Sequence, residues 1–240
     1  MNDKILSEVN RKGIFINDQL LNDSDKNNLK RDFEKKKDYE FIRINDDEEI
    51  KKISNTLFNF LHRDYINQFL IDYLGNGKKC THLLFTRSKP ESKKKDSEYI
   101  ESGSVLGFHN DDVGKQIKIN ILLSDLKKNA NGLEYAIASH KLSLLDKGII
   151  TFFNILGFFK NWSKHFINYQ INKIKGIRVN FMSEEKVKSK FKLTRVFGKS
   201  GLIYIFDTNG FHRQATVENE NISNTERELI TIYFNQKKLN

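Results

Sequence analysis

The clearest pattern in the chain is the alternation of apolar and other residues between positions 116 and 123. Isoleucine occupies every second position there, and a lysine and an asparagine lie between the isoleucines. Successive side chains of a strand point to opposite faces of a sheet, so this spacing predicts a β-strand. Two later runs, 201–206 and 228–234, are apolar at most positions, which is typical of strands buried in a two-layer structure. Shorter extended segments are expected at 81–86 and 104–111.

The first third of the chain has a helical pattern instead. Apolar residues recur at spacings of three and four in 53–61 and again in 66–73. Another helix is expected to begin near Asn22, because small polar side chains there can bond the free amides of a first helical turn. With one short strand expected at 13–16, residues 1–79 are interpreted as a mainly helical support for a sheet. The chain is therefore expected to be an α+β protein with a mainly β core.

Residues 142–198 are the hardest part to interpret. They include an aromatic stretch at 149–159, too short to cross a membrane as a helix, and a lysine-rich stretch at 186–192. Helices and loop are expected here, forming an insertion that could act as a lid. Because the 240 residues show no repeat or break in composition, we expect a single domain with its core in 80–141 and 200–236.

Charge and cysteine content add weaker constraints. Lys and Arg total 41 against 31 Asp and Glu, a formal net charge of +10 that could attract nucleic acid, anionic lipid or an anionic small molecule. The positive residues are spread along the chain, however, so an ordinary solvated surface explains them equally well. A single cysteine, Cys80, forms no intrachain disulfide and suits a reducing compartment. The first residues lack the pattern of a secretory signal, so the cytoplasm is the expected location.

Two short segments about a hundred residues apart suggest chemistry. They are 107–111, Gly-Phe-His-Asn-Asp, and 206–213, Phe-Asp-Thr-Asn-Gly-Phe-His-Arg. His109 and Asp111 are two residues apart, so both can reach one ion from a single strand. His212 follows a buried strand and a tight turn, and is the best candidate for a third ligand. Two imidazoles and one carboxylate hold Fe(II) on one face and leave positions open for oxygen chemistry.

Each of these residues also has a structural interpretation. A His-x-Asp triplet alone is a weak signal, because His109 could be a hydrogen-bonded core residue and Asp111 a turn residue. Arg227 opens the last strong strand, and an arginine aimed into a core needs an anion because an unpaired buried guanidinium is costly. Its alternatives are a salt bridge to an internal Asp or Glu, or an exposed position at the strand end.

The order of these motifs resembles the phytanoyl-CoA dioxygenase-like branch of the Fe(II)/2-oxoglutarate oxygenases. Members of that family have a His-x-Asp triplet, a segment of the type Gly-x-Leu-x-x-Phe-x-x-x-x-x-His-Arg, and an Arg on the following strand. This chain has them at 109–111, 201–213 and Arg227. Residues 131–141, Asn-Gly-Leu-Glu-Tyr-Ala-Ile-Ala-Ser-His-Lys, are similar to the family's run of Asn-Gly, apolar strand and Gly-Ser-His-Lys. The resemblance covers only the two core segments.

The resemblance implies a double-stranded β-helix, a cupin-like jelly-roll with helices packed on one side and the site in its mouth. His109, Asp111 and His212 would then bind Fe(II). Arg227 would bind the far carboxylate of 2-oxoglutarate, and O2 would be the third reactant. The expected reaction is hydroxylation of a small-molecule or carrier- or lipid-linked metabolite, with release of succinate and CO2. Weaker arguments add further candidate contacts to 2-oxoglutarate: Thr231, Tyr233 and Asn120.

The chain departs from the family in three places. Ala138 stands where Gly is common, and Phe108 stands where Trp is frequent before the first histidine. The segment between His212 and Arg227 is longer than usual, which makes Arg213 a second candidate for binding the cosubstrate carboxylate. Arg227 is preferred because the family places this residue on the final strand.

Competing functions stay open. The preferred hydroxylase would take a small substrate that could be anionic. A nucleic-acid oxidative demethylase would resemble it in ligands but usually adds a second arginine six residues after the first, where this chain has Tyr233, so nucleic acid is not the expected partner. Asp111 argues against a halogenase, because related halogenases have a small residue there. A jelly-roll binding protein without turnover is the alternative outside enzymes. His140 is interpreted as structural, since the three-ligand set is complete without it. The sequence gives no indication of oligomeric state.

Overall fold

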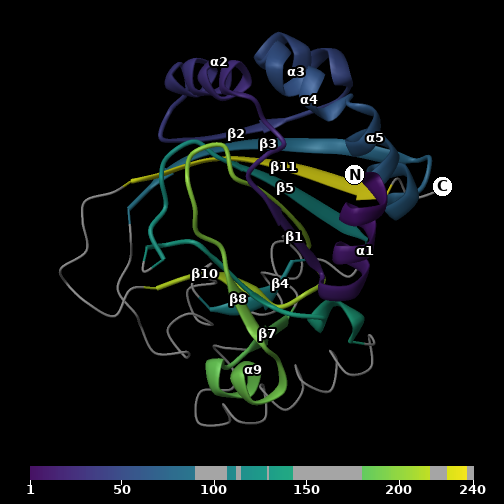
Figure 1. The fold of residues 1–240 in the computed structure, drawn as a ribbon, viewed down its shortest axis with the longest axis vertical. Coiled ribbons are helices and arrows are strands. Elements are labelled where there is room, and N and C mark those ends of the chain that lie inside the picture. The colour runs from purple at the N-terminus through teal and green to yellow at the C-terminus, as the bar shows by residue number, and fades with distance from the viewer. Residues whose placement is uncertain (90–106, 112–114, 129, 143–179, 217–225, 237–240) are drawn as a thin grey trace, which may run out of the picture.

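Two antiparallel sheets face each other in the computed structural model, and helices cover the outer face of the larger sheet (Figure 1). The residues that the structure describes are 1–89, 107–111, 115–128, 130–142, 180–216 and 226–236. Within them, the larger sheet has the strand order β1 (Ile14–Asn17), β9 (Ile203–Asp207), β5 (Gln116–Leu122), β11 (Arg227–Gln236), β3 (Lys78–Ser88), β2 (Tyr39–Arg43). The smaller sheet has the order β7 (Asn180–Met182), β4 (Phe108–Asn110), β10 (His212–Gln214), β6 (Leu133–Ala136), β8 (Leu193–Arg195).

From β3 onward the chain passes back and forth between the two sheets. Strands β3, β5, β9 and β11 belong to the larger sheet, while β4, β6, β8 and β10 belong to the smaller one. This alternation is the double-stranded β-helix that the sequence predicted, and every strand pair in it is antiparallel. Among the described strands, none pairs across from one sheet to the other, so the two layers do not close into a barrel.

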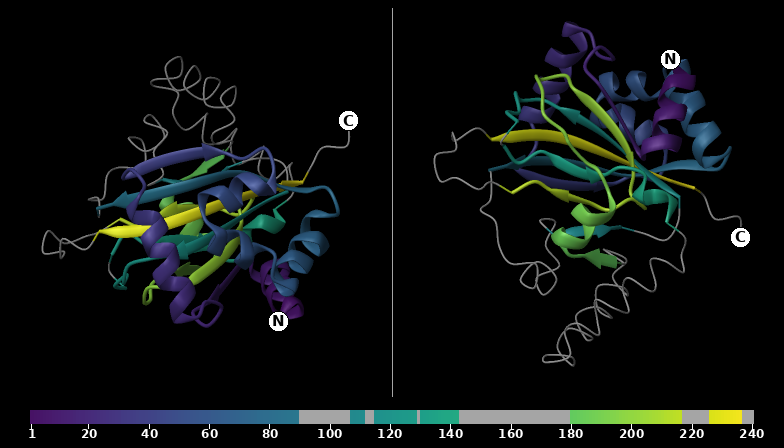
Figure 2. Two further views of the ribbon diagram at one scale, coloured as in Figure 1. Left: turned by 90° about the horizontal axis from the view of Figure 1, so that it is seen from above. Right: turned by 60° about the horizontal axis from the view of Figure 1, so that its bottom comes forward.

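The N-terminal helices lie together on one side of the molecule (Figure 2). They are α1 (Asn2–Lys12), α2 (Asp23–Glu34), α3 (Asp47–Ile53), α4 (Asn55–Leu61) and α5 (Asp64–Leu74). Helix α9 (Glu184–Lys190) and a 3₁₀ turn (Ser139–Lys141) lie near the smaller sheet. The Asn22 side chain accepts a bond from the amide of Asp25, so α2 begins where the sequence indicated. No helix in the described part of the chain is long and apolar enough to span a membrane.

Strand β5 shows why its sequence alternates. Ile117, Ile119 and Ile121 are fully buried in the core between the larger sheet and the helices. Lys118 and Asn120 point to the opposite, inner face, toward the smaller sheet. Because the outer face supplies the packing, the inner face can carry polar side chains without loss of the strand.

Four strands were not predicted: β2, β7, β8 and β10, the last of which contains His212. β2 lies in the segment interpreted as helical support, and its five residues alternate without a clean apolar face. Residues 142–198 were expected to hold helices and loop, but β7 and β8 lie in their described part, and β8 pairs with β6 as a core strand. Strands of three to five residues depend on their partners for stability, so the local sequence carries little signal for them. The aromatic stretch at 149–159 lies outside the described residues.

Candidate metal centre

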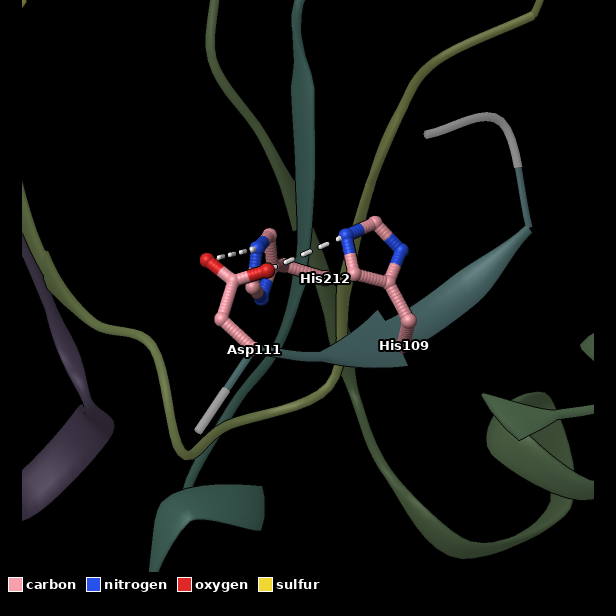
Figure 3. A group of neighbouring side chains, drawn as sticks. All are labelled: His109, Asp111 and His212. Carbon is pink, nitrogen blue, oxygen red and sulfur yellow. Dashed lines mark ion pairs between the residues drawn. The ribbon is translucent and has the colours of Figure 1, made fainter. Parts of the chain in front are cut away.

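Two neighbouring strands of the smaller sheet bring the predicted ligands together. His109 on β4 is directly paired with His212 on β10, and their ring centroids are 4.6 Å apart. Asp111 follows β4 immediately, and its carboxylate lies between the two imidazoles (Figure 3). One ligand atom from each residue lies within 4.8 Å of the other two. Among the described residues, these three side chains form the group of acidic, His or Cys residues that could hold a metal ion.

Backbone carbonyls fix the orientation of both imidazoles. Nδ1 of His109 lies 2.6 Å from the Gly107 oxygen, and Nδ1 of His212 lies 2.9 Å from the Gly210 oxygen. A carbonyl oxygen only accepts, so each Nδ1 carries the proton and donates it. Each Nε2 then keeps its lone pair on the side of Asp111. Such carbonyl bonds are the usual way in which metal-binding histidines are oriented.

The spacing of the donor atoms fits a first-row divalent ion. Nε2 of His109 lies 3.5 Å from Asp111 Oδ1, and Nε2 of His212 lies 3.7 Å from Asp111 Oδ2. Such ions bind nitrogen and oxygen at about 2.0–2.2 Å, so two ligands at right angles lie about 3 Å apart. A small rotation of the carboxylate would therefore complete the site. Two imidazoles and one carboxylate on one side are the donor set typical of non-haem Fe(II).

Lys118 on β5 is part of this centre, although the sequence analysis did not select it. Its ammonium contacts Asp111 Oδ2, and both side chains are largely buried. Burial by itself would raise the pKa of the Asp111 carboxyl. The charge of the adjacent Lys118 ammonium is the largest opposing influence and holds that pKa well below its ordinary value. The carboxylate is therefore ionised, as a metal ligand must be.

Aromatic packing holds His212 in place. The Phe206 ring meets the His212 ring edge to face at 4.9 Å, and the Tyr135 ring is stacked beside it at 6.5 Å. The Tyr135 hydroxyl donates to the Asp207 carbonyl at 3.0 Å, which fixes the turn before the histidine. Gly210 is required in that turn, because a Cβ there would lie 1.9 Å from the Tyr135 hydroxyl oxygen.

Arg227 is buried on the inner face, with 8% of its surface exposed. It donates to the Asn131 carbonyl at 2.6 Å and to Oε1 of Gln214 at 3.0 Å, and its Nε has no acceptor. Both acceptors are neutral, and no carboxylate among the described residues pairs with this guanidinium. Burial lowers the pKa of Arg227, with the Tyr204 hydroxyl acting in the opposite direction. Of the alternatives left open, Arg227 is not at an exposed position, and it forms no salt bridge with any acidic side chain that the structure describes.

Arg213, unlike Arg227, has acidic partners among the described residues. Its guanidinium donates to Glu134 at 2.7 Å and to Glu184 at 3.1 Å. Two carboxylates therefore balance its charge, and the pKa of Arg213 is raised, because these pairs outweigh burial. His140 lies outside the metal-binding group and donates from Nε2 to the Asn10 carbonyl at 3.2 Å, in keeping with its structural interpretation.

The remaining predicted contacts line the inner face between Lys118 and Arg227. Thr231 donates to Oδ1 of Asn120 at 2.7 Å, and Nδ2 of Asn120 is buried without an acceptor. Tyr233 lies against the Lys118 ammonium, 4.8 Å from its ring centroid, rather than beside Arg227. None of these placements tests a role in cosubstrate binding.

Tyr204 is a second inner-face residue, besides Lys118, that the sequence analysis did not select. Burial raises its pKa to about 12, while the charges of Arg227 and Lys118 lower it. The Tyr204 hydroxyl therefore lies close enough to both Arg227 and Lys118 for their charges to affect its pKa. The period of two along β9 could have placed it there, but an apolar run on both faces hides that signal.

The fold and the site together define a double-stranded β-helix protein with a His-Asp-His donor set. No family model matches the sequence, so its assignment to the phytanoyl-CoA dioxygenase-like branch stays a prediction. No curated protein matches it either.

Solved structures of the same fold are similar along the whole chain. AviO1 from Streptomyces viridochromogenes Tue57 is 14% identical, with a TM-score of 0.59, over 99% of this chain and 96% of its own. HygX from Streptomyces hygroscopicus, with nickel and 2-oxoglutarate bound, is 12% identical, with a TM-score of 0.58, over 98% and 87%. SnoN, a non-haem α-ketoglutarate-dependent epimerase of nogalamycin biosynthesis, is 10% identical, with a TM-score of 0.57, over 98% and 80%. At such low identity the likeness establishes the shared fold.

Proposed function

We propose that this chain is an Fe(II)- and 2-oxoglutarate-dependent oxygenase in which His109, Asp111 and His212 bind the metal. The observation that carries the proposal is the convergence of two carbonyl-oriented imidazoles and one ionised carboxylate on a single point. This donor set leaves positions open for a chelating cosubstrate and O2. The structural neighbour HygX has been crystallised with iron and with nickel and 2-oxoglutarate, which supports the same cofactor and cosubstrate here.

Arg227 is proposed to bind the far carboxylate of 2-oxoglutarate. A dicarboxylate that reaches the metal with one end needs a cation for the other, and Arg227 is a buried cation with no acidic partner among the described residues. The N–H group at Nε of Arg227 has no acceptor in the described part of the chain and could donate a hydrogen bond to a carboxylate. Asn120 and Thr231 are proposed to line the same space, again because Nδ2 of Asn120 lacks an acceptor.

When bound, the metal would couple decarboxylation of 2-oxoglutarate to oxidation of a second substrate. The protein's own groups would prepare that step. The Gly107 and Gly210 carbonyls hold the imidazoles, Lys118 keeps the carboxylate ionised, and the Phe206 ring packs against His212. We infer hydroxylation of a small molecule, with succinate and CO2 as coproducts. HygX has been crystallised with the small molecule hygromycin B, which is consistent with a substrate of this size.

Epimerisation is a second candidate, because the neighbour SnoN is described as an epimerase. The mass of the product separates the two reactions. Hydroxylation adds one oxygen atom to the substrate, whereas epimerisation leaves its mass unchanged. A nucleic-acid demethylase receives no comparable support from the described residues.

An anaerobic titration tests the metal and the cosubstrate together. Adding Fe(II) and then 2-oxoglutarate to the wild-type protein should produce a weak visible charge-transfer band. The Asp111→Ala variant should remain folded by circular dichroism but give no band, because it loses one of three ligands. The proposal would be wrong if iron-loaded, folded wild-type protein showed no band, or if Asp111→Ala bound iron as tightly as wild type.

A further inference from the structure

A single cross-sheet row on the inner face runs from the candidate metal centre to the outer edge of β2. Directly paired residues of five neighbouring strands form it: Phe206, Lys118, Tyr233, His82 and Arg43. Directly paired residues of an antiparallel sheet point to the same face. Because Lys118 contacts Asp111, this row is continuous with the site.

Three rings at the β2 end of this row form what we call the aromatic platform: Phe41, His82 and Tyr233. Phe41 is stacked on His82, with ring centroids 4.5 Å apart and an angle of 28°. Tyr233 meets both rings edge to face, at 6.3 Å from Phe41 and 6.1 Å from His82. Tyr233 also faces the Lys118 ammonium, so the aromatic platform begins directly beside the metal centre.

The aromatic platform is open on the side that faces away from the core. Phe41 is 50% exposed and the neighbouring Tyr39 is 68% exposed, while Ile42 on the other face of β2 packs against the buried core. Burial, and then the charge of Arg43, lowers the pKa of His82, so its imidazole is neutral and stacks as an uncharged ring. Exposed aromatic surface next to a reactive centre is typical of a ligand-binding surface.

The geometry points to a substrate with two linked rings, one stacked on Phe41 of the aromatic platform and the other beside the metal centre. This inference rests on the proposed function for the site of oxidation. Three strand spacings separate β5 from β2, which is roughly 14 Å, so a single ring cannot reach both ends. Aromatic rings stack on phenylalanine, and the apolar faces of sugar rings do so as well. The shared chemistry is therefore a flat apolar ring face.

Saturation-transfer NMR with three probes tests this on the full-length chain without added metal. The probes are methyl β-cellobioside with two sugar rings, 4,4′-dihydroxybiphenyl with two aromatic rings, and 1,8-octanediol, an open chain of similar length. At least one two-ring probe should bind, and octanediol should not. Phe41→Ala should weaken that binding at least tenfold, whereas Phe41→Trp should retain it. Phe197→Ala is the matched control, because Phe197 is 46% exposed but is not part of the aromatic platform.

Binding of the cellobioside alone would identify a glycoside-like substrate, and binding of the biphenyl alone a flat aromatic one. The inference is overturned if neither two-ring probe binds, if octanediol binds as well as they do, or if Phe41→Ala leaves the binding unchanged. The iron and 2-oxoglutarate band, measured on the same proteins, should be unchanged in Phe41→Ala. Loss of the band in wild type would refute the proposed function, while ring binding that depends on Phe41 would still stand.

Discussion

Replacing Arg227 by methionine separates cosubstrate binding from stability. The substitution removes a buried guanidinium whose partners are a backbone carbonyl and the Gln214 amide oxygen. No described carboxylate loses an ion pair, and methionine fills a similar volume. Burying a charge that lacks an acidic partner is costly, so its removal recovers desolvation free energy. We therefore expect the free energy of unfolding of the metal-free protein to change by no more than about 1–2 kcal/mol, because this recovery offsets the loss of the two hydrogen bonds.

The effect on 2-oxoglutarate should be much larger. Each hydrogen bond to a charged group contributes about 1.5–3 kcal/mol, so a carboxylate held by two guanidinium bonds loses roughly 3–6 kcal/mol. At about 1.4 kcal/mol per factor of ten, the dissociation constant should rise between about 100-fold and 20,000-fold. Arg227→Lys should recover part of this loss, because it keeps the charge but not the two-pronged geometry.

Arg213→Met is the matched comparison and should show the opposite pattern. It leaves Glu134 and Glu184 without their buried cation, which typically costs about 3–5 kcal/mol of stability. Its folded fraction should bind 2-oxoglutarate as the wild type does. Urea unfolding measures the stabilities, and anaerobic titration of the iron-loaded proteins with 2-oxoglutarate measures the affinities. The reasoning fails if Arg227→Met binds 2-oxoglutarate normally, or if Arg213→Met is the variant that loses it.

Two further substitutions test the surroundings of the ligands. Lys118→Met should destabilise the metal-free protein by about 3–5 kcal/mol, because Asp111 loses its buried cation. It should nevertheless bind Co(II) at least tenfold more tightly by calorimetry. A divalent ion and an ammonium about 5 Å apart repel by roughly 7 kcal/mol at a dielectric constant of about 20, whereas loss of an outer-shell bond costs 10- to 100-fold in affinity, or about 1.4–2.8 kcal/mol. Weaker binding would contradict this expectation. Tyr73→Phe removes the 2.5 Å bond to Asp207 and should cost about 1–3 kcal/mol. Burial, and then Asp207, raises the pKa of Tyr73 above its ordinary 10.0. The wild type should therefore lose more stability than the variant as pH rises through 10. If the free energy of unfolding in urea fell equally with pH in both proteins between pH 8 and 11, the reasoning would be wrong.

Periodicity predicted β5, α4 and α5, because each of them has one face that must be apolar, whereas β9 and β11 were predicted from their apolar runs. β5 is the clearest case: its isoleucines pack against the helices over seven residues, enough to define a period of two. β8 has three residues, all partly exposed, and is held by its pairing with β6. No window of the local sequence contains that partner, so the strand could not be predicted from its own residues.

The three candidate ligands could be predicted because His109 and Asp111 lie two residues apart at the end of β4, where a spacing of two fixes a common direction. The partners that complete the centre come from elements distant in sequence. Lys118 reaches Asp111 from the opposite sheet, and the lack of an acidic partner for Arg227 among the described residues becomes evident only when its neighbours are known. A resemblance in motif order identifies which residues meet at a site, but not which of their charges are balanced there.

The pairing of positions 118 and 233 bears directly on the type of substrate. They are directly opposite each other on β5 and β11, and the Tyr233 ring receives the Lys118 ammonium at 4.8 Å. The resembling nucleic-acid demethylases usually have an arginine where this chain has Tyr233. An arginine there would place a second cation directly opposite Lys118, and like charges in that arrangement are destabilising. Because Lys118 is already committed to Asp111, the residue opposite it must be uncharged or acidic. The aromatic ring of Tyr233 satisfies this condition and is also part of the aromatic platform. Tyr233 therefore disfavours a demethylase and favours a substrate that stacks on the aromatic platform.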